Sequence, residues 1–134
     1  MSQETYMWVK ALQQRLSARS NATEAAAMEA YMKNKVIFFG IKAGPRREIL
    51  KEHLDLNGMP VPFESDLFKQ LWADTHREMQ HCGLDIMRRQ AKKIKLEDIG
   101  LIEELICTKS WWDTVDGLAT WVCGPYFKIG RAHV

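Results

Sequence analysis

The sequence predicts an all-α protein built from antiparallel pairs of helices. Apolar residues recur at the three- and four-residue spacing of amphipathic helices in roughly six or seven segments of the chain. Short polar, glycine or proline breaks separate these segments, so consecutive helices are expected to fold back on one another. The run at residues 36–41 could pass for a strand, but no partner strand is evident, and we interpret it as a buried connector. Stacked helix pairs are typical of helical repeat proteins, although no self-similarity at a fixed period is visible.

The first two expected helices occupy the N-terminal part of the chain. An apolar stripe from Met7 to Leu16 defines the first, and a mostly polar stretch ends it. The second begins after a side-chain cap at Asn21 or Thr23 and continues to Tyr31 through a run of strong helix formers.

Four more helices are expected before residue 108. One has Pro45 at its first position, where the missing N–H of proline is harmless, and ends at Asn57-Gly58. A proline-containing linker leads to the next, over residues 64–73. Thr75 and Glu78 have the spacing of a capping box, and the helix they open ends in basic residues that suit its dipole. A further helix covers residues 96–107. The residues expected to face the core in the helices after the linker include Leu67, Leu71, Trp72, Met79, Cys82, Ile86 and Met87.

Composition limits the class of protein. The chain of 134 residues, with 46% hydrophobic and 27% charged residues, is expected to form one globular domain. Its net charge of +2 means that nucleic-acid binding would need a local basic face. No apolar run is long enough to span a membrane, and the acidic N-terminus argues against a signal peptide, so we expect a cytoplasmic protein. The cysteines Cys82, Cys107 and Cys123 fit reduced thiols better than disulfides or a zinc site, and the histidines His53, His76, His81 and His133 are expected at the surface.

The motif Ser110-Trp111-Trp112-Asp113-Thr114-Val115-Asp116 is the strongest candidate for a functional site. At about 100° per helical residue, Trp112 and Asp116 point nearly the same way, on the rim of an apolar arc that faces a core. There an indole face and a carboxylate can meet a ligand. The alternative is purely structural, with Trp111 packed in the core and Asp113 favouring the first helical turn.

A second candidate site is a group of basic residues. Five cations flank the aromatic connector, and such a group beside a helix N-terminus can hold backbone phosphates. The alternative is an ordinary solvated face. The five cations are Lys33, Lys35, Lys42, Arg46 and Arg47.

Several motifs together resemble the AlkD-like DNA alkylation repair family. They are Tyr31-Met32-Lys33-Asn34-Lys35, Phe39-Gly40-Ile41-Lys42, Arg46-Arg47, Glu104-Leu105-Ile106 and the segment from Ser110 to Asp116. The similarity runs in order from about Trp8 to Phe127. The resemblance implies a HEAT-like superhelix of helix pairs that uses no metal or organic cofactor. It also implies a monomeric DNA glycosylase that excises positively charged N3- and N7-alkylated purines from double-stranded DNA.

The resemblance also implies roles for individual residues. Asp116 matches the family's catalytic aspartate, and Trp112 matches a tryptophan that packs on the deoxyribose. Tyr31 matches a tyrosine near the DNA backbone. The family is understood to leave the lesion stacked and to attack from the sugar side. One departure is the start of the helix at Pro45, where a capping hydroxyl of the family pattern is missing.

The end of the chain carries a separate expectation. Residues 129–134 read as a translated sequencing adapter, so we expect residues 1–127 to be the N-terminal part of one HEAT-like domain and residues 128–134 to be a non-native tail. The family's phosphate-binding arginine and second tryptophan would then lie beyond Phe127, and the chain alone is expected to be inactive and poorly behaved. Two other functions stay open: a non-catalytic helical-repeat module that binds distorted or branched DNA, and a protein scaffold with no DNA role.

Overall fold

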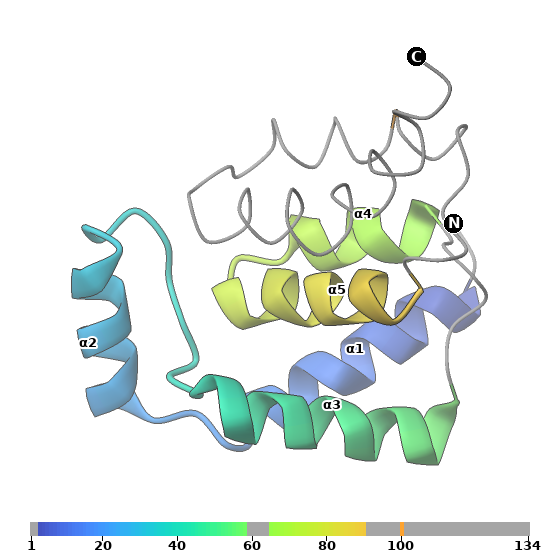
Figure 1. Cartoon of the computed structure of the whole chain (residues 1–134), viewed down its shortest axis with the longest axis horizontal. Helices are drawn as coiled ribbons and strands as arrows, with labels where there is room; N and C mark the ends of the chain where they lie inside the picture. Colours follow the sequence, from blue (N-terminus) through green and yellow to red (C-terminus); the bar gives the residue numbers. More distant parts are fainter. Residues whose placement is uncertain (1–2, 59–64, 91–99, 101–134) are drawn as a thin grey trace, which may run out of the picture.

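The computed structural model describes residues 3–58, 65–90 and 100, and the part of the chain that it describes is all-α, as expected (Figure 1). These residues contain no β-strand. An isolated parallel bridge joins Ile37 to His76, with the Arg77 N–H donating to the Ile37 carbonyl at 2.8 Å. The helices are α1 (Gln3–Ser17), α2 (Ala22–Tyr31), α3 (Ala43–Asn57), α4 (Ser65–Ala73) and α5 (Arg77–Arg89).

Four of the five helices share one hydrophobic core. Helix α1 packs against α3 and α4, and α5 packs against α3 and α4. In Figure 1, α4 and α5 lie side by side and run in opposite directions. Helix α2 stands apart at one side and contains no buried residue, so it forms a wall beside the core. The fully buried side chains include Leu12, Leu16, Leu50, Leu67, Phe68, Leu71, Trp72, Met79, Ile86 and Met87, which confirms the core residues predicted for α4 and α5.

The helix ends agree with the sequence at α2 and differ at α3. The Asn21 side chain caps α2 by accepting the Glu24 N–H at 3.0 Å. Helix α3 begins at Ala43, so the prediction that Pro45 occupies its first position is wrong: Pro45 is the third residue. The position is still permitted because N–H groups of the first turn have no partner within a helix. At the other end, Gly58 terminates α3 with a φ of 80°, which favours glycine.

The predicted capping box at Thr75 is also wrong. Helix α5 begins at Arg77 and its N-cap is His76, whose N–H donates to the Asp74 carboxylate at 2.8 Å. Glu78, the second residue of α5, is 1% exposed, and its side chain points toward the connector at residues 36–41. The Glu78 carboxylate accepts three backbone N–H groups, from Phe39 at 2.9 Å, Gly40 at 2.9 Å and Ile41 at 3.1 Å. These bonds to a distant segment replace the local cap that the spacing indicated.

Only the second half of the connector at residues 36–41 is buried. Phe39, Gly40 and Ile41 are buried, whereas Ile37 is 45% exposed. Gly40 has a φ of 97°, and a Cβ at this position would overlap the Asn21 carbonyl oxygen and lie 2.7 Å from the Ala25 nitrogen. Only glycine satisfies both the conformation and the close approach of α2. The connector thus lies between α2 and the start of α5.

His53 is not at the surface as predicted, because it is fully buried between α1 and α3. Its Nε2–H donates to the Trp8 carbonyl at 3.1 Å, and its Nδ1 accepts the Arg15 Nε–H at 3.1 Å. The Trp8 ring meets the imidazole edge-on, with ring centroids 4.4 Å apart. Asn57, one turn further along α3, places its amide 3.1 Å from Nδ1. These contacts suit the neutral imidazole, and burial followed by the Arg15 charge lowers the pKa of His53 from 6.5.

This lowered pKa predicts that the protein loses stability in mild acid. The unfolded chain binds a proton at His53 below about pH 6.5, whereas the folded chain resists that proton, so the free energy of unfolding falls as the pH drops below 6.5. The charged groups beside the ring are Arg15 on α1 and Glu52 on α3, which pairs with Arg15 at 3.3 Å. We expect a His53→Gln variant, which keeps a donor and an acceptor but cannot be protonated, to show a flatter pH dependence in urea unfolding between pH 8 and pH 5. Equal pH dependence of variant and wild type would contradict this assignment.

Candidate functional site

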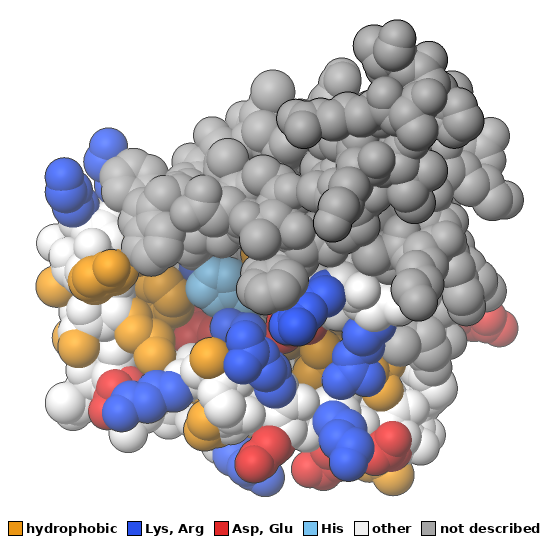
Figure 2. All heavy atoms as spheres, in the orientation of Figure 1, with side chains coloured by type: hydrophobic (Ala, Val, Ile, Leu, Met, Phe, Trp, Pro, Cys, Tyr) orange, Lys and Arg blue, Asp and Glu red, His pale blue; other side chains and the backbone are white. Residues whose placement is uncertain are grey.

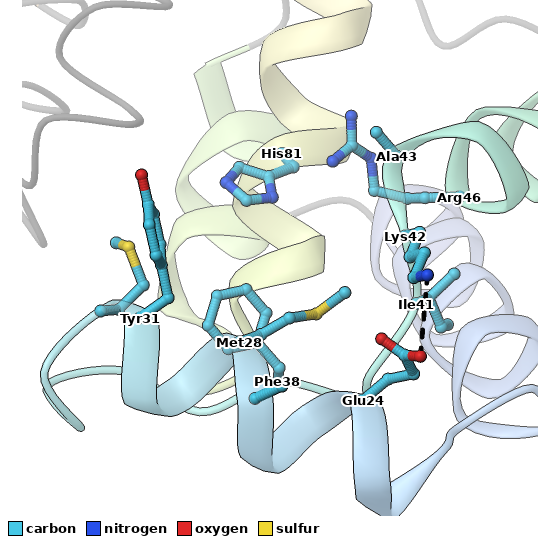
Figure 3. A pocket seen from close by; sticks show the side chains of 11 residues that line it. Glu24, Met28, Tyr31, Phe38, Ile41, Lys42, Ala43, Arg46 and His81 are labelled. Atoms are coloured by element: carbon cyan, nitrogen blue, oxygen red, sulfur yellow. Dashed lines mark ion pairs between the residues drawn. The ribbon is translucent and has the colours of Figure 1, made fainter.

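A groove lies between α2 and the junction of α3 with α5. Its volume is about 410 Å³, and its walls are mostly apolar, with charged groups along one side (Figure 3). Figure 3 shows Tyr31 on the α2 side, His81 of α5 above the groove, and Lys42 and Arg46 on the α3 side. We call this the α2 groove; its lining residues are Glu24, Ala27, Met28, Tyr31, Met32, Phe38, Ile41, Lys42, Ala43, Arg46 and His81.

Tyr31 is the aromatic residue of the α2 groove that is most accessible to a ligand. It is the last residue of α2 and is 71% exposed. A tyrosine normally buries much of its ring, so an exposed ring on the wall of a groove favours contact with a ligand. The structure therefore puts the tyrosine singled out in the sequence at the edge of a concave site.

Lys33 and Lys35 follow Tyr31 but do not line the α2 groove. Both are exposed in the turn after α2, and Lys33 and its neighbour Asn34 each have a φ of 57°. The left-handed conformation is unfavourable for non-glycine residues by about 1 kcal/mol or more each. Backbone bonds hold the turn, with the Asn34 N–H donating to the Glu29 carbonyl at 2.7 Å. The two lysines thus extend a positive surface outward from the Tyr31 end of the groove.

The three cations around the start of α3 have different environments. Lys42 is exposed and pairs with Glu24 across the groove at 3.7 Å. Arg46 is 8% exposed; its Nη2 donates to the Asp85 carboxylate at 3.1 Å, and its buried Nε has no hydrogen-bond partner among the described residues. Arg47 is exposed and lies 4.0 Å from the other oxygen of Asp85. The sequence grouped these residues as one basic cluster, and the structure divides them into one buried ion pair and two accessible cations.

The two residues expected to carry catalysis, Trp112 and Asp116, lie outside the described residues. Their assignment as catalytic residues therefore stays a prediction. Cys107, Cys123 and His133 also lie outside the described residues, so the expectations for them stay predictions.

Sequence reasoning missed two residues that shape the groove. His81 was expected to be an ordinary surface residue, but it lines the groove and tilts against Phe38, with ring centroids 6.4 Å apart. Glu78 fixes the connector, which supplies Phe38 and Ile41 to the lining and leads directly to Lys42. A signal for Glu78 was available: it precedes Cys82 by four residues and Ile86 by eight, which puts a carboxylate on the apolar face of α5.

The described residues offer no thiol nucleophile and no metal site. Cys82 is fully buried, and burial raises the pKa of its thiol to about 12, so it stays protonated and inert. No group of three or more histidine, cysteine or carboxylate side chains in the described part of the chain could hold a metal ion. None of the five described helices combines the length and apolar character needed to cross a membrane.

Comparisons with known proteins agree with the motifs in the sequence. A family model described as "DNA alkylation repair enzyme" matches residues 12–132. A solved structure described as a predicted DNA alkylation repair enzyme from Enterococcus faecalis is similar, with a TM-score of 0.69 and 26% sequence identity. The similarity covers 84% of this chain and 55% of that protein, so this chain spans about half of its length. No significant match was found among curated proteins. Because the family model matches most of the chain, this protein belongs to the DNA alkylation repair enzyme family.

Proposed function

We propose that the whole protein is a DNA glycosylase that hydrolyses the N-glycosidic bond of positively charged N3- or N7-alkylated purines in double-stranded DNA. The observation that carries this proposal is the family match over residues 12–132, which contains every motif quoted above. The accessible Tyr31 at the edge of a groove beside cationic side chains supports it. The HEAT-like stacking of helix pairs belongs to the same proposal.

Cleavage of this glycosidic bond depends on negative charge near the sugar, and it does not need a pocket that holds the base. Alkylation at N3 or N7 makes the purine a cationic leaving group, so the glycosidic bond breaks toward an oxocarbenium-like sugar. In this proposal the Asp116 carboxylate stabilises that developing positive charge and positions the attacking water. The electron-rich face of Trp112 packs on the deoxyribose and favours the same charge.

The described residues supply the part of the site that holds the DNA. In this proposal, Tyr31 lies against the backbone of the DNA, and Lys33, Lys35, Lys42 and Arg47 contact phosphates. Arg46 contributes differently, because its charge is already paired with Asp85. Its ion pair joins α3 to α5 and so keeps one wall of the α2 groove in position.

Base release from methylated DNA tests the proposed function directly. We expect the whole protein to release 7-methylguanine or 3-methyladenine from methylated duplex DNA, and no base from unmethylated DNA, as measured by chromatography of the soluble fraction. Salt-dependent DNA binding without release of either base would overturn the proposed glycosylase activity and favour a non-catalytic DNA-binding module. Absence of both binding and release would overturn both and leave a scaffold.

A further inference from the structure

Helix α2 is held in place by polar contacts and not by the hydrophobic core. None of its ten residues is buried, and Figure 2 shows hydrophobic side chains exposed over α2, at the left of the view. Packing of an apolar face normally fixes a helix against its neighbours, so α2 needs another means of attachment. Its attachment matters for the α2 groove, because α2 supplies one wall of that groove, including Tyr31 at the end of the helix.

One attachment is at the N-terminal end of α2. The Asn21 N–H donates to the Phe39 carbonyl at 2.9 Å, and Gly40 lies close to the same turn. An ion pair of 3.7 Å between Glu24 and Lys42 adds little, because the two side chains are 39% and 68% exposed. These contacts fix the start of α2 and leave its C-terminal end to be held separately.

Glu29 holds the C-terminal end of α2. Its carboxylate accepts the Phe38 N–H at 3.1 Å, and its backbone carbonyl accepts the Asn34 N–H at 2.7 Å. The first bond joins α2 to the connector at residues 36–41, and the second closes the turn that follows the helix. Glu29 precedes Tyr31 by two residues, so both bonds act at the end of α2 that carries the tyrosine.

The connector is a firm support for this attachment. Glu78 of α5 accepts the N–H groups of the next three residues, so two carboxylates from different helices hold four consecutive N–H groups of the connector. Glu78 is buried, whereas Glu29 is partly buried. Glu29 therefore links the end of α2 to a segment that is itself fastened to α5.

Glu29 and Tyr31 lie on different faces of α2. At about 100° per helical residue, their side chains point about 200° apart. Tyr31 lines the α2 groove, and Glu29 is not among the lining residues (Figure 3). The Glu29 carboxylate thus acts on the groove through the position of the helix. We propose that Glu29 is a positioning residue that holds Tyr31 in place against the DNA backbone. This inference rests on the proposed function, in which Tyr31 lies against that backbone.

Two substitutions of Glu29 separate its hydrogen bond from its charge. Glu29→Gln and Glu29→Ala both remove a negative charge, which by itself favours DNA binding, but only Gln keeps an oxygen that can accept the Phe38 N–H. We would measure the affinity of the whole protein for fluorescently labelled undamaged duplex DNA at one salt concentration. Glu29→Ala should bind about threefold or more weakly than Glu29→Gln. Equal affinities of the two variants would overturn the proposal.

A double-mutant cycle with Tyr31→Ala shows whether the effect passes through the tyrosine. Without the Tyr31 ring, the position of the end of α2 should no longer matter for this contact. The difference in affinity between Glu29→Ala and Glu29→Gln should therefore disappear in the Tyr31→Ala background. A purely structural role of Glu29 would leave the same difference in both backgrounds, and that result would also overturn the proposal.

The melting temperature shows whether each variant is folded. Glu29 packs in no apolar core, so we expect both variants to fold. If Glu29→Ala does not fold, Glu29→Asp replaces it: this variant keeps the charge, is shorter by one methylene, and should bind more weakly than the wild type only when Tyr31 is present. If the wild type binds DNA and neither comparison depends on Tyr31, the role of Glu29 is overturned while the proposed function stands. If the wild type binds no DNA, the proposed function fails, and this inference fails with it.

Discussion

Replacing Asp116 by Asn is expected to reduce base excision by the whole protein about a hundred-fold or more. The change removes the negative charge that the proposed mechanism places near the anomeric carbon, but it retains the shape of the side chain. DNA affinity should stay nearly the same because phosphate contacts, which provide most of the binding energy, come from other residues. The measurement is single-turnover release of 7-methylguanine from methylated DNA, with DNA binding measured in parallel.

Asp113→Asn is the matched control for this variant. Asp113 lies three residues before Asp116 in the same motif, and we assign it no contact with the reacting sugar. Its replacement should leave excision within a few-fold of the wild type. Excision that survives in Asp116→Asn, or that falls equally in both variants, would show that Asp116 does not have the proposed role.

Replacing Glu78 by Gln is expected to destabilise the fold strongly. One carboxylate with almost no exposure accepts three consecutive backbone N–H groups. An amide of the same shape has one oxygen acceptor, and its NH₂ group would face a backbone N–H donor. Hydrogen bonds to a charged group contribute about 1.5–3 kcal/mol each, so we expect the free energy of unfolding to fall by about 3 kcal/mol or more in urea titrations.

Glu48→Gln makes the same chemical change at an exposed position of α3 and should alter stability by less than about 0.5 kcal/mol. A Glu78→Gln variant as stable as Glu48→Gln would mean that the connector is held by other contacts. The Glu78 variant should also bind DNA less tightly under conditions in which it remains folded, since the connector that Glu78 holds supplies Phe38 and Ile41 to the α2 groove and leads directly to Lys42.

Local pattern predicted most of the helices and much of the core. The spacing of Leu67, Leu71 and Trp72 is periodic enough to show which face of α4 is buried. Helix ends were predictable where a side chain or a glycine acts on its own neighbours, as Asn21 does at α2 and Gly58 at α3. The same reasoning failed at Thr75, because the spacing of a capping box cannot reveal that Glu78 has three better donors elsewhere.

The candidate site was predictable in its residue types and not in its geometry. Motifs singled out Tyr31 and the basic residues after it, and the structure places Tyr31 on the wall of a groove. Nothing local distinguishes Arg46 from Arg47, which are adjacent and chemically identical. Their separation into a buried ion pair and an accessible cation depends on Asp85, which lies 39 positions after Arg46 in the chain.

Apolar periodicity and motifs within short windows were enough to predict the all-α fold class, the buried helix faces and the family. Such local patterns did not predict that His53 is buried beside Trp8, that Glu78 holds the connector or that Arg46 pairs with Asp85. A buried polar side chain is stabilised by the partners that the packed helices bring to it, and these partners lie tens of residues away in the chain.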